Sequence, residues 1–461
     1  MNPWAGRALV GCAAGYVLFL GWAMQRLSYD VWGALVVAPL IVTLSIPLIQ
    51  RAFPNDRELA LIAFAGLGLK LAGSAARYWI AFDAYGGAAD AGRYHLFGKA
   101  LAGEIRGGRT SVLRVIPAGT GTQFVERLTA TVYTMFGSSR LGGFMLFGWM
   151  AFWGAVLLIR AATIAVPGLE VRRYAILVFG LPSLVYWPSS IGKEAWMMLC
   201  LGLASYGCAR LLGRGRALRS VAFTALGLTG AAFVRPHMAG MWLAGVALAL
   251  VGALFVGGGA GRERSRFAMV VLALIAIVGL SFVAAFAIRY LEPGANDGDD
   301  IKAQSSVTVI FEETERRSEQ GGSGFETIDL NGPQTWPYAI VRTVTRPLLH
   351  EARSLAELLP AVEMTALLAA AVLGWRRFAN VVPMIRRSPY VLFALAVVMM
   401  FGLAFTSIGN LGILTRQRSL VLPLLLIPWC LPPLPRRSAR VGAASAANNE
   451  APVPGALLRA H

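Results

Sequence analysis

Long apolar runs alternate with short polar segments along almost the whole chain. A helix needs about 20 mostly apolar residues to cross the hydrocarbon core of a bilayer. By that criterion the sequence predicts about twelve membrane-spanning helices. The predicted spans are Leu9–Met24, Val31–Ile49, Leu59–Ala75, Leu141–Ile159, Tyr174–Trp187, Ala195–Leu211, Val221–Val234, Met238–Phe255, Phe267–Ile288, Leu355–Leu373, Tyr390–Phe405 and Ile413–Leu431. The expected fold class is therefore all-α, a polytopic integral membrane protein.

Two polar segments are too long to be simple turns between spans. They cover about residues 77–140 and 289–353, and we expect two large loops there. Within the first, Phe124–Phe136 carries Glu126 and Arg127 among apolar residues, which indicates an amphipathic or re-entrant helix. The polar, proline-containing segment after the last span predicts a disordered tail. The predicted organisation is a transmembrane domain over residues 1–435 and a tail over residues 436–461.

Composition supports the membrane class, and the charge pattern gives an orientation. Of 461 residues, 56% are hydrophobic and only 14% are charged, and the formal net charge is +18. Many of the arginines stand in short clusters next to apolar runs. These clusters are Arg210, Arg214, Arg216 and Arg219; Arg262, Arg264 and Arg266; Arg376, Arg377, Arg386 and Arg387; and Arg436, Arg437 and Arg440. Such clusters are typical of cytoplasmic loops, so both termini are expected inside and both large loops outside, and nucleic-acid binding is not expected.

The cysteines and histidines predict no metal or disulfide chemistry. All four cysteines lie in or beside apolar spans, and the four histidines are scattered along the chain. Neither set has the spacing of a metal-ligand group or of a disulfide framework.

One polar interruption between two spans stands out, the sequence YWPSSIGKEAWM at Tyr186–Met197. It sets Lys193 beside Glu194, and ionisable groups at membrane depth are costly unless they pair or face water. The simplest interpretation is a local ion pair that closes a turn, with Glu194 holding Lys193. The alternative is a functional site on the outer face.

The predicted topology places other unusual charges on that same outer face. They are Asp83, Asp90 and His95 in the first loop, Arg235 between spans seven and eight, Arg346 and Glu351 at the end of the second loop, and Arg416 and Arg418 at the start of the last span. Arginine binds phosphate oxygens through two N–H groups and lysine acts as a point charge. An aspartate within reach can accept the proton of an attacking hydroxyl. Each residue also has a structural interpretation: solvated loop aspartates, a structural His95, and arginines whose side chains extend to lipid headgroups.

Several stretches resemble known families. The aspartate-bearing first loop, FDAYGGAADAGRYHLFGKAL, followed by many spans, resembles the GT-C class of polytopic glycosyltransferases. The strings LPSLVYWPSSIGKEAWM, VTRPLLHEARSLAELLPAVE and GNLGILTRQRSLVLPLLLIP resemble membrane proteins that accompany bacterial exopolysaccharide genes. The GT-C resemblance implies a polyprenyl-phosphate-linked sugar donor and a catalytic aspartate in the first external loop, here Asp90 or Asp83. The chain lacks the paired-acid motif and the large C-terminal domain of that class, which leaves a divalent cation open as a cofactor.

The sequence therefore predicts a glycosyltransferase in the cytoplasmic (inner) membrane of a bacterium, acting on its outer face in cell-surface polysaccharide assembly. Asp90 would be the base, and Asp83 the other candidate. Lys193, Arg235, Arg416, Arg418 and His95 would bind the donor phosphate, and Arg346, Glu351 and Glu194 would position a glycan or lipid acceptor.

Three alternatives accompany this hypothesis. The chain also resembles O-antigen polymerases and ligases, which implies chemistry carried by external arginines. A transporter for lipid-linked oligosaccharides would line a path through the membrane with polar groups, and Lys70 inside the third predicted span is one such group. A scaffold subunit of a polysaccharide-export complex would carry no chemistry.

Overall fold

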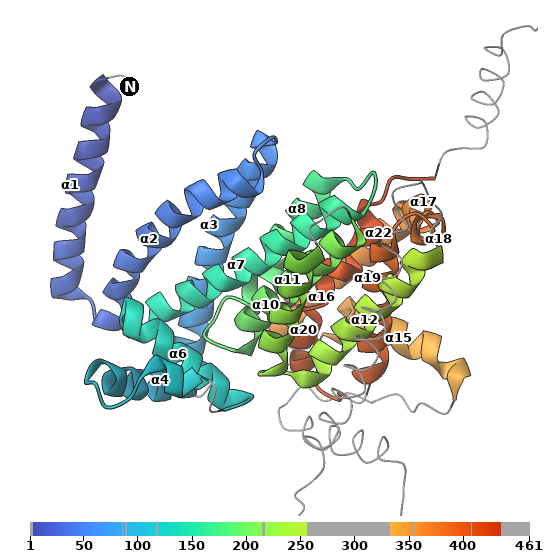
Figure 1. The fold of residues 1–461 in the computed structure, drawn as a ribbon. Coiled ribbons are helices and arrows are strands. Elements are labelled where there is room, and N and C mark those ends of the chain that lie inside the picture. The colour runs from blue at the N-terminus through green and yellow to red at the C-terminus, as the bar shows by residue number, and fades with distance from the viewer. Residues whose placement is uncertain are drawn as a thin grey trace, which may run out of the picture.

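The structure is a computed structural model that describes residues 3–434 except 85, 88–89, 117–118, 214–216, 256–331, 353–354 and 407. It is all-helical, as predicted (Figure 1). The α-helices are α1 (Pro3–Arg26), α2 (Tyr29–Ala52), α3 (Arg57–Trp79), α4 (Asp90–Arg106), α5 (Val112–Val115), α6 (Thr122–Phe136), α7 (Arg140–Ala165), α8 (Val171–Gly180), α9 (Pro182–Tyr186), α10 (Lys193–Leu212), α11 (Ala217–Ala232), α12 (Pro236–Phe255), α15 (Trp336–Thr345), α16 (Leu355–Leu373), α17 (Trp375–Phe378), α18 (Val381–Ile385), α19 (Pro389–Ala404), α20 (Leu411–Arg418), α21 (Leu422–Leu425) and α22 (Ile427–Cys430). Single π or 3-10 turns are η1 (Ile80–Ala84), η3 (Pro333–Thr335) and η4 (Leu349–Glu351).

The described part of the chain contains helices suited to a membrane. Five of them, α2, α3 with η1, α7, α10 and α12, are long and apolar enough to cross a bilayer. A sixth span results if α16 counts together with α17 and α18, which bend away from it by 78°. The ninth predicted span, Phe267–Ile288, most of the second predicted loop and the predicted tail lie outside the described residues.

Two segments predicted as continuous spans are broken in the structure. The predicted span Tyr174–Trp187 is divided into α8 and α9 at Leu181. The last predicted span is divided into α20, α21 and α22, with Pro423 and Pro428 at the starts of the later two. Proline has no N–H to donate and its ring clashes with the preceding helical turn, so each break coincides with a proline that apolar content alone does not weigh.

Helices α7, α10 and α11 form a closely packed centre. A methyl group added at Gly202 of α10 would lie 2.3 Å from the carbonyl oxygen of Gly154 in α7. On the other side of α10, a methyl group at Gly227 of α11 would lie 2.5 Å from the carbonyl oxygen of Cys200. Backbones approach this closely only where side chains are absent, the usual way that helices associate in membranes.

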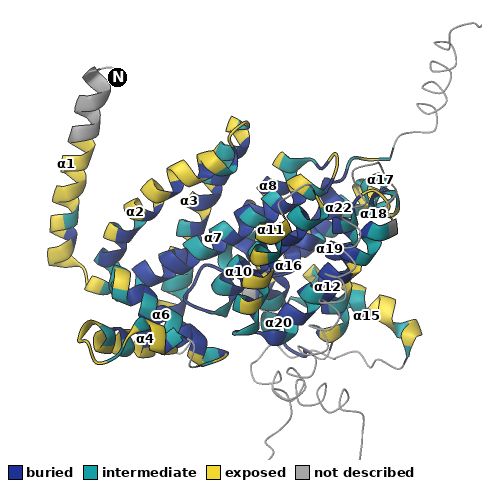
Figure 2. Ribbon diagram, viewed as in Figure 1, coloured by how far each residue is buried: buried dark blue, intermediate teal, exposed yellow. Residues whose placement is uncertain are grey.

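The outer surfaces of α1 to α3 are strongly apolar. Leu18 is 75% exposed and Trp22 53% exposed, and Leu61 on α3 is 57% exposed. Figure 2 shows the described part of α1 and much of α2 exposed, whereas α7 and α10 contain many buried residues. In a membrane, lipid would cover these exposed apolar side chains.

Ion pairs and hydrogen bonds identify two ends of the bundle, which we name the Glu170 end and the Asp90 end. At the Glu170 end, Arg377 of α17 donates to Glu170 at 2.7 Å, and Arg160 of α7 donates to the carbonyl of Ala52. At the Asp90 end lie α4, α6, α20 and the turns before α10 and α12 (Figure 1). The predicted Phe124–Phe136 helix is confirmed there as α6.

Candidate functional site

A network of ion pairs at the Asp90 end joins four elements that lie far apart in the sequence. Arg416 of α20 contacts Asp90 of α4 (Nη1–Oδ2, 3.2 Å) and Glu194 of α10 (Nε–Oε1, 2.6 Å). The same Glu194 oxygen accepts a hydrogen bond from Nη2 of Arg235, also at 2.6 Å. We call Asp90, Lys193, Glu194, Arg235 and Arg416 the anion cluster.

Local structure explains how each side chain reaches the cluster. Asp90 and Glu194 both lie in the first turn of a helix, where the helix dipole favours a negative charge. Arg235 occupies the turn between α11 and α12, and Pro236, which needs no N–H partner, begins α12. Asn410 caps α20 through its side chain (Oδ1 to the Ile413 N–H, 3.0 Å), so that Arg416 follows within the same short helix.

The cluster is buried at its centre and open at its rim. The Glu194 side chain is 3% exposed and that of Arg235 9% exposed, whereas the Asp90 side chain is 62% exposed. Lys193 interacts electrostatically with the other four members, and forms no ion pair with any described residue. Asp90 is therefore the member most accessible to a solute.

The anion cluster has one more positive than negative charge, and one of its hydrogen-bond donors has no partner among the described residues. Two carboxylates face three cations, which leaves one positive charge. In addition, Nη1 of Arg235 is buried and has no hydrogen-bond partner among the described residues. A buried donor without a partner costs free energy, and an oxyanion that accepts from Arg235 would supply both the partner and the missing charge.

Tyr94 lies one helical turn after Asp90 and is buried. Burial, together with the neighbouring Asp90 carboxylate, raises the pKa of Tyr94 to about 12. Its hydroxyl is therefore protonated at neutral pH and can donate a hydrogen bond beside the cluster.

The structure separates Arg418 from Arg416, although only one residue lies between them. Arg418 is completely buried and donates through Nη1 to the carbonyl of Arg346. Arg346 in turn pairs with Glu351 (Nε–Oε1, 2.5 Å), and Glu351 also accepts from the Leu348 N–H at 2.9 Å. Arg346, Glu351 and Arg418 thus form a second group of charges.

The other two sequence candidates lie outside the anion cluster. Asp83 is exposed in η1 and makes no ion pair within the described part of the chain. His95 is buried, with Nδ1 2.7 Å from the hydroxyl of Tyr133, and burial lowers the pKa of His95 to about 4. Neutral His95 therefore joins α4 to α6.

The prediction that Lys193 and Glu194 form a local ion pair is wrong. The Glu194 carboxylate is directed to Arg235 and Arg416, which come from distant parts of the chain. Two arginines that approach from the start of α12 and from α20 satisfy the buried carboxylate better than a flexible neighbour on the same turn, because a guanidinium presents several N–H donors in a fixed plane.

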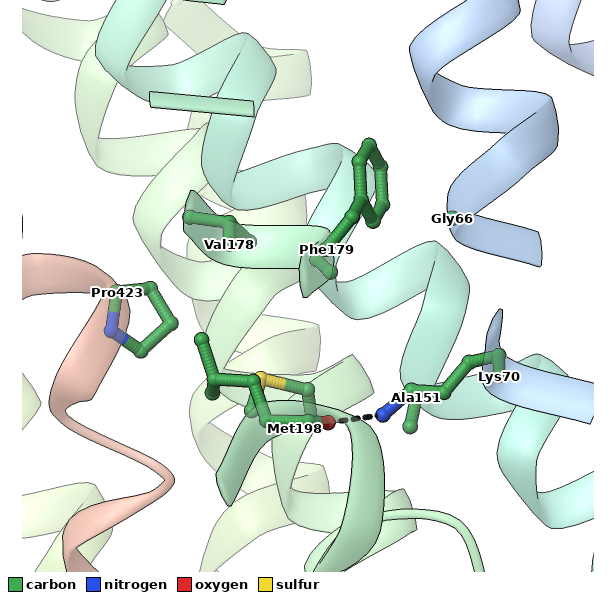
Figure 3. A pocket seen from close by; sticks show the side chains of 9 residues that line it. Gly66, Lys70, Ala151, Val178, Phe179, Met198 and Pro423 are labelled. Carbon is green, nitrogen blue, oxygen red and sulfur yellow. Dashed lines mark hydrogen bonds between the residues drawn. The ribbon is translucent and has the colours of Figure 1, made fainter. Parts of the chain in front are cut away.

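The sequence singled out Lys70, but it did not predict that Lys70 and Glu363 both contact α9. Lys70 of α3 donates to the carbonyl of Leu184, as the dashed line in Figure 3 shows, beside a small cavity that Phe179, Met198 and Pro423 help to line. Glu363 of α16 accepts from the N–H of Ser183 at 2.7 Å. An acidic residue inside a predicted span, shortly after Pro360, was the signal available for Glu363.

Within the described residues, no group of three His, Cys, Asp or Glu side chains is placed to hold a metal ion. No known family model, curated protein or solved structure matches the chain.

Proposed function

We propose that the protein is a membrane glycosyltransferase that uses a polyprenyl-phosphate-linked sugar and contributes to bacterial cell-surface polysaccharide assembly. One observation carries the proposal. A solvent-accessible carboxylate, Asp90, lies in an ion-pair network with Arg416, Glu194 and Arg235. Lys193 lies within electrostatic reach of all four, and the five groups together lack one anion. A sugar phosphate needs both features, cations for the phosphate and a base for the attacking hydroxyl.

The membrane arrangement follows the distribution of arginines. At the Glu170 end lie Arg160, Arg172, Arg173 and Arg377, which make hydrogen bonds or ion pairs there. Clusters of this kind favour the cytoplasmic side, so the Asp90 end would face outward. About twelve spans, with both termini inside, fit this orientation.

Each member of the anion cluster has a role in the proposed reaction. Nη1 of Arg235, the Lys193 ammonium and Arg416 bind the donor phosphate and stabilise the charge that develops on it. Asp90 accepts the proton of the acceptor hydroxyl as that oxygen bonds to the anomeric carbon. The bond between the anomeric carbon and the phosphate oxygen breaks, and polyprenyl phosphate leaves. Glu194 holds the two arginines, while Arg346 and Glu351 position the acceptor.

Product formation in proteoliposomes tests the proposal. Asp90→Asn is expected to lower turnover by about a hundredfold or more, the usual contribution of a general base, while Asp83→Asn and the exposed Glu104→Gln retain activity. Arg235→Gln is expected to raise the KM for the lipid-linked donor.

A second candidate, an arginine-based polymerase or ligase, is favoured by the convergence of Arg235 and Arg416 on one buried carboxylate. It predicts that folded Asp90→Asn protein keeps full activity while Arg235→Gln and Arg416→Gln lose it. That outcome would reject Asp90 as the base. Full activity in all three variants would reject both candidates.

A further inference from the structure

Helix α9 is a five-residue helix whose backbone polar groups can be accounted for almost completely. The carbonyl of Ser183 accepts from the Trp187 N–H at 3.2 Å, and that of Tyr186 accepts from the Ser189 N–H at 3.3 Å. The carbonyl of Val185 accepts from the Ser189 hydroxyl. Two groups remain, the Leu184 carbonyl and the Ser183 N–H, because the break at Pro182 removes the helical turn that would have bonded Ser183.

Ionisable side chains from two other helices satisfy these two groups. The Lys70 ammonium donates to the Leu184 carbonyl, and the Glu363 carboxylate accepts from the Ser183 N–H at 2.7 Å. Lys70 is 7% exposed and Glu363 5% exposed. Burying an ammonium and a carboxylate in a helical bundle is expensive.

Helix α9 continues directly into the segment that carries two members of the anion cluster. Residues 187–192 connect it to Lys193, and Ser189, Ser190 and Ile191 in that connection are buried. Arg77 of α3 fixes the start of the connection, donating to the Tyr186 hydroxyl at 2.9 Å and lying over the Tyr186 and Trp187 rings. The backbone of α3 is also close, since a methyl group at Gly73 would lie 2.7 Å from the Val185 carbonyl oxygen.

We infer that Lys70 and Glu363 are positioning residues that clamp α9 from two neighbouring helices, α3 and α16, and thereby fix Lys193 and Glu194 in the anion cluster. The clamp acts through hydrogen bonds to the main chain, so it holds α9 whatever its side chains are. The effect on ligand binding rests on the proposed anion site, whereas the effect on the connecting segment does not.

Cysteine labelling measures the clamp independently of any activity. Ser190→Cys is introduced into a Cys12→Ser background, and its rate of reaction with a water-soluble maleimide is followed by peptide mass spectrometry. Lys70→Met and Glu363→Leu are expected to raise this rate about tenfold, because labelling of a buried residue requires local opening. Glu363→Gln, whose amide oxygen can still accept from Ser183, should stay within about twofold of the parent protein.

The buried Cys208 of α10 is the internal control. Its labelling rate should stay unchanged in all variants, because a local clamp does not open the bundle centre. An unchanged rate at Ser190→Cys would overturn the inference. A parallel rise at Cys208 would also overturn it, since that pattern means general destabilisation.

Binding of farnesyl phosphate separates the clamp from the proposed function. Arg235→Gln should weaken binding directly, and Lys70→Met should weaken it about fivefold or more through displacement of Lys193 and Glu194, an effect of the size typical for coupled sites. If Arg235→Gln weakens binding and Lys70→Met does not, the clamp does not position the cluster. If Arg235→Gln has no effect, the proposed anion site is wrong, and the labelling result alone decides whether α9 is clamped.

Discussion

Glu194→Gln removes the buried negative charge that Arg235 and Arg416 share while keeping the size of the side chain. Both arginines approach the same Glu194 oxygen, each at 2.6 Å. After the substitution Arg416 still has Asp90 at 3.2 Å, whereas Arg235 loses its carboxylate within a buried environment. The charge of the anion cluster rises from one positive charge to two.

The expected cost follows from the burial of Arg235. Two unit charges about 4 Å apart attract by roughly 4 kcal/mol at an effective dielectric constant of about 20. Removing one partner of a buried pair typically destabilises a protein by about 3–5 kcal/mol. Because the glutamine oxygen still accepts a hydrogen bond and Arg416 keeps Asp90, we expect a loss near the lower limit, about 3 kcal/mol.

Thermal unfolding in detergent, with and without phosphate, tests this reasoning. A bound anion present at about 100 times its Kd stabilises the folded state by about 2.7 kcal/mol, so phosphate should recover most of the loss in Glu194→Gln. The matched control is Glu104→Gln on the exposed face of α4, which should unfold like the wild type under both conditions. The reasoning is refuted if Glu194→Gln unfolds at the wild-type temperature, or if phosphate stabilises the variant no more than the wild type.

Two further predictions concern packing and pH. Gly202→Ala should destabilise the protein by about 1–3 kcal/mol through overpacking against Gly154. The control Gly68→Ala, with open space around its added methyl group, should stabilise α3 by about 0.5–1 kcal/mol. The yield of folded protein in size-exclusion chromatography measures both effects, and equal yields would contradict the close approach of α7 and α10. The pKa of His95, about 4 in the folded protein, lies below its ordinary value, so the unfolded chain binds the proton more readily and stability should fall as the pH drops from about 6.5 towards 4. His95→Gln should flatten this dependence in melting curves recorded between about pH 7.5 and pH 5, on either side of the ordinary histidine pKa, and an unchanged slope would show that another group is responsible.

Apolar content predicted most of the helices because a segment that crosses the hydrocarbon core has to be both apolar and helical. A segment such as Leu141–Ile159 has no charged side chain to place in water, and α7 covers it completely. The same criterion missed the breaks at Leu181 and within the last predicted span, because a proline changes hydropathy little but removes a backbone hydrogen bond. A helix break also needs partners for the backbone groups that it leaves free. At α9 these partners are Lys70 of α3 and Glu363 of α16, which the local sequence around the break does not contain.

The sequence by itself determined an all-helical membrane protein and marked the residues whose charge is unusual between apolar runs. The cost of a charge near apolar spans is enough to make Lys193, Glu194, Arg235 and Arg416 conspicuous in the sequence. Asp90 stood out through its place in the first large polar loop and through the family resemblance of that loop. Only the tertiary structure decided their partners. It directed Glu194 to two distant arginines instead of to Lys193, and it separated Arg418 from Arg416 by turning different faces of α20 to different neighbours. The physical reason is that a helix fixes the direction of each side chain, but the packing of other helices decides which charge it meets.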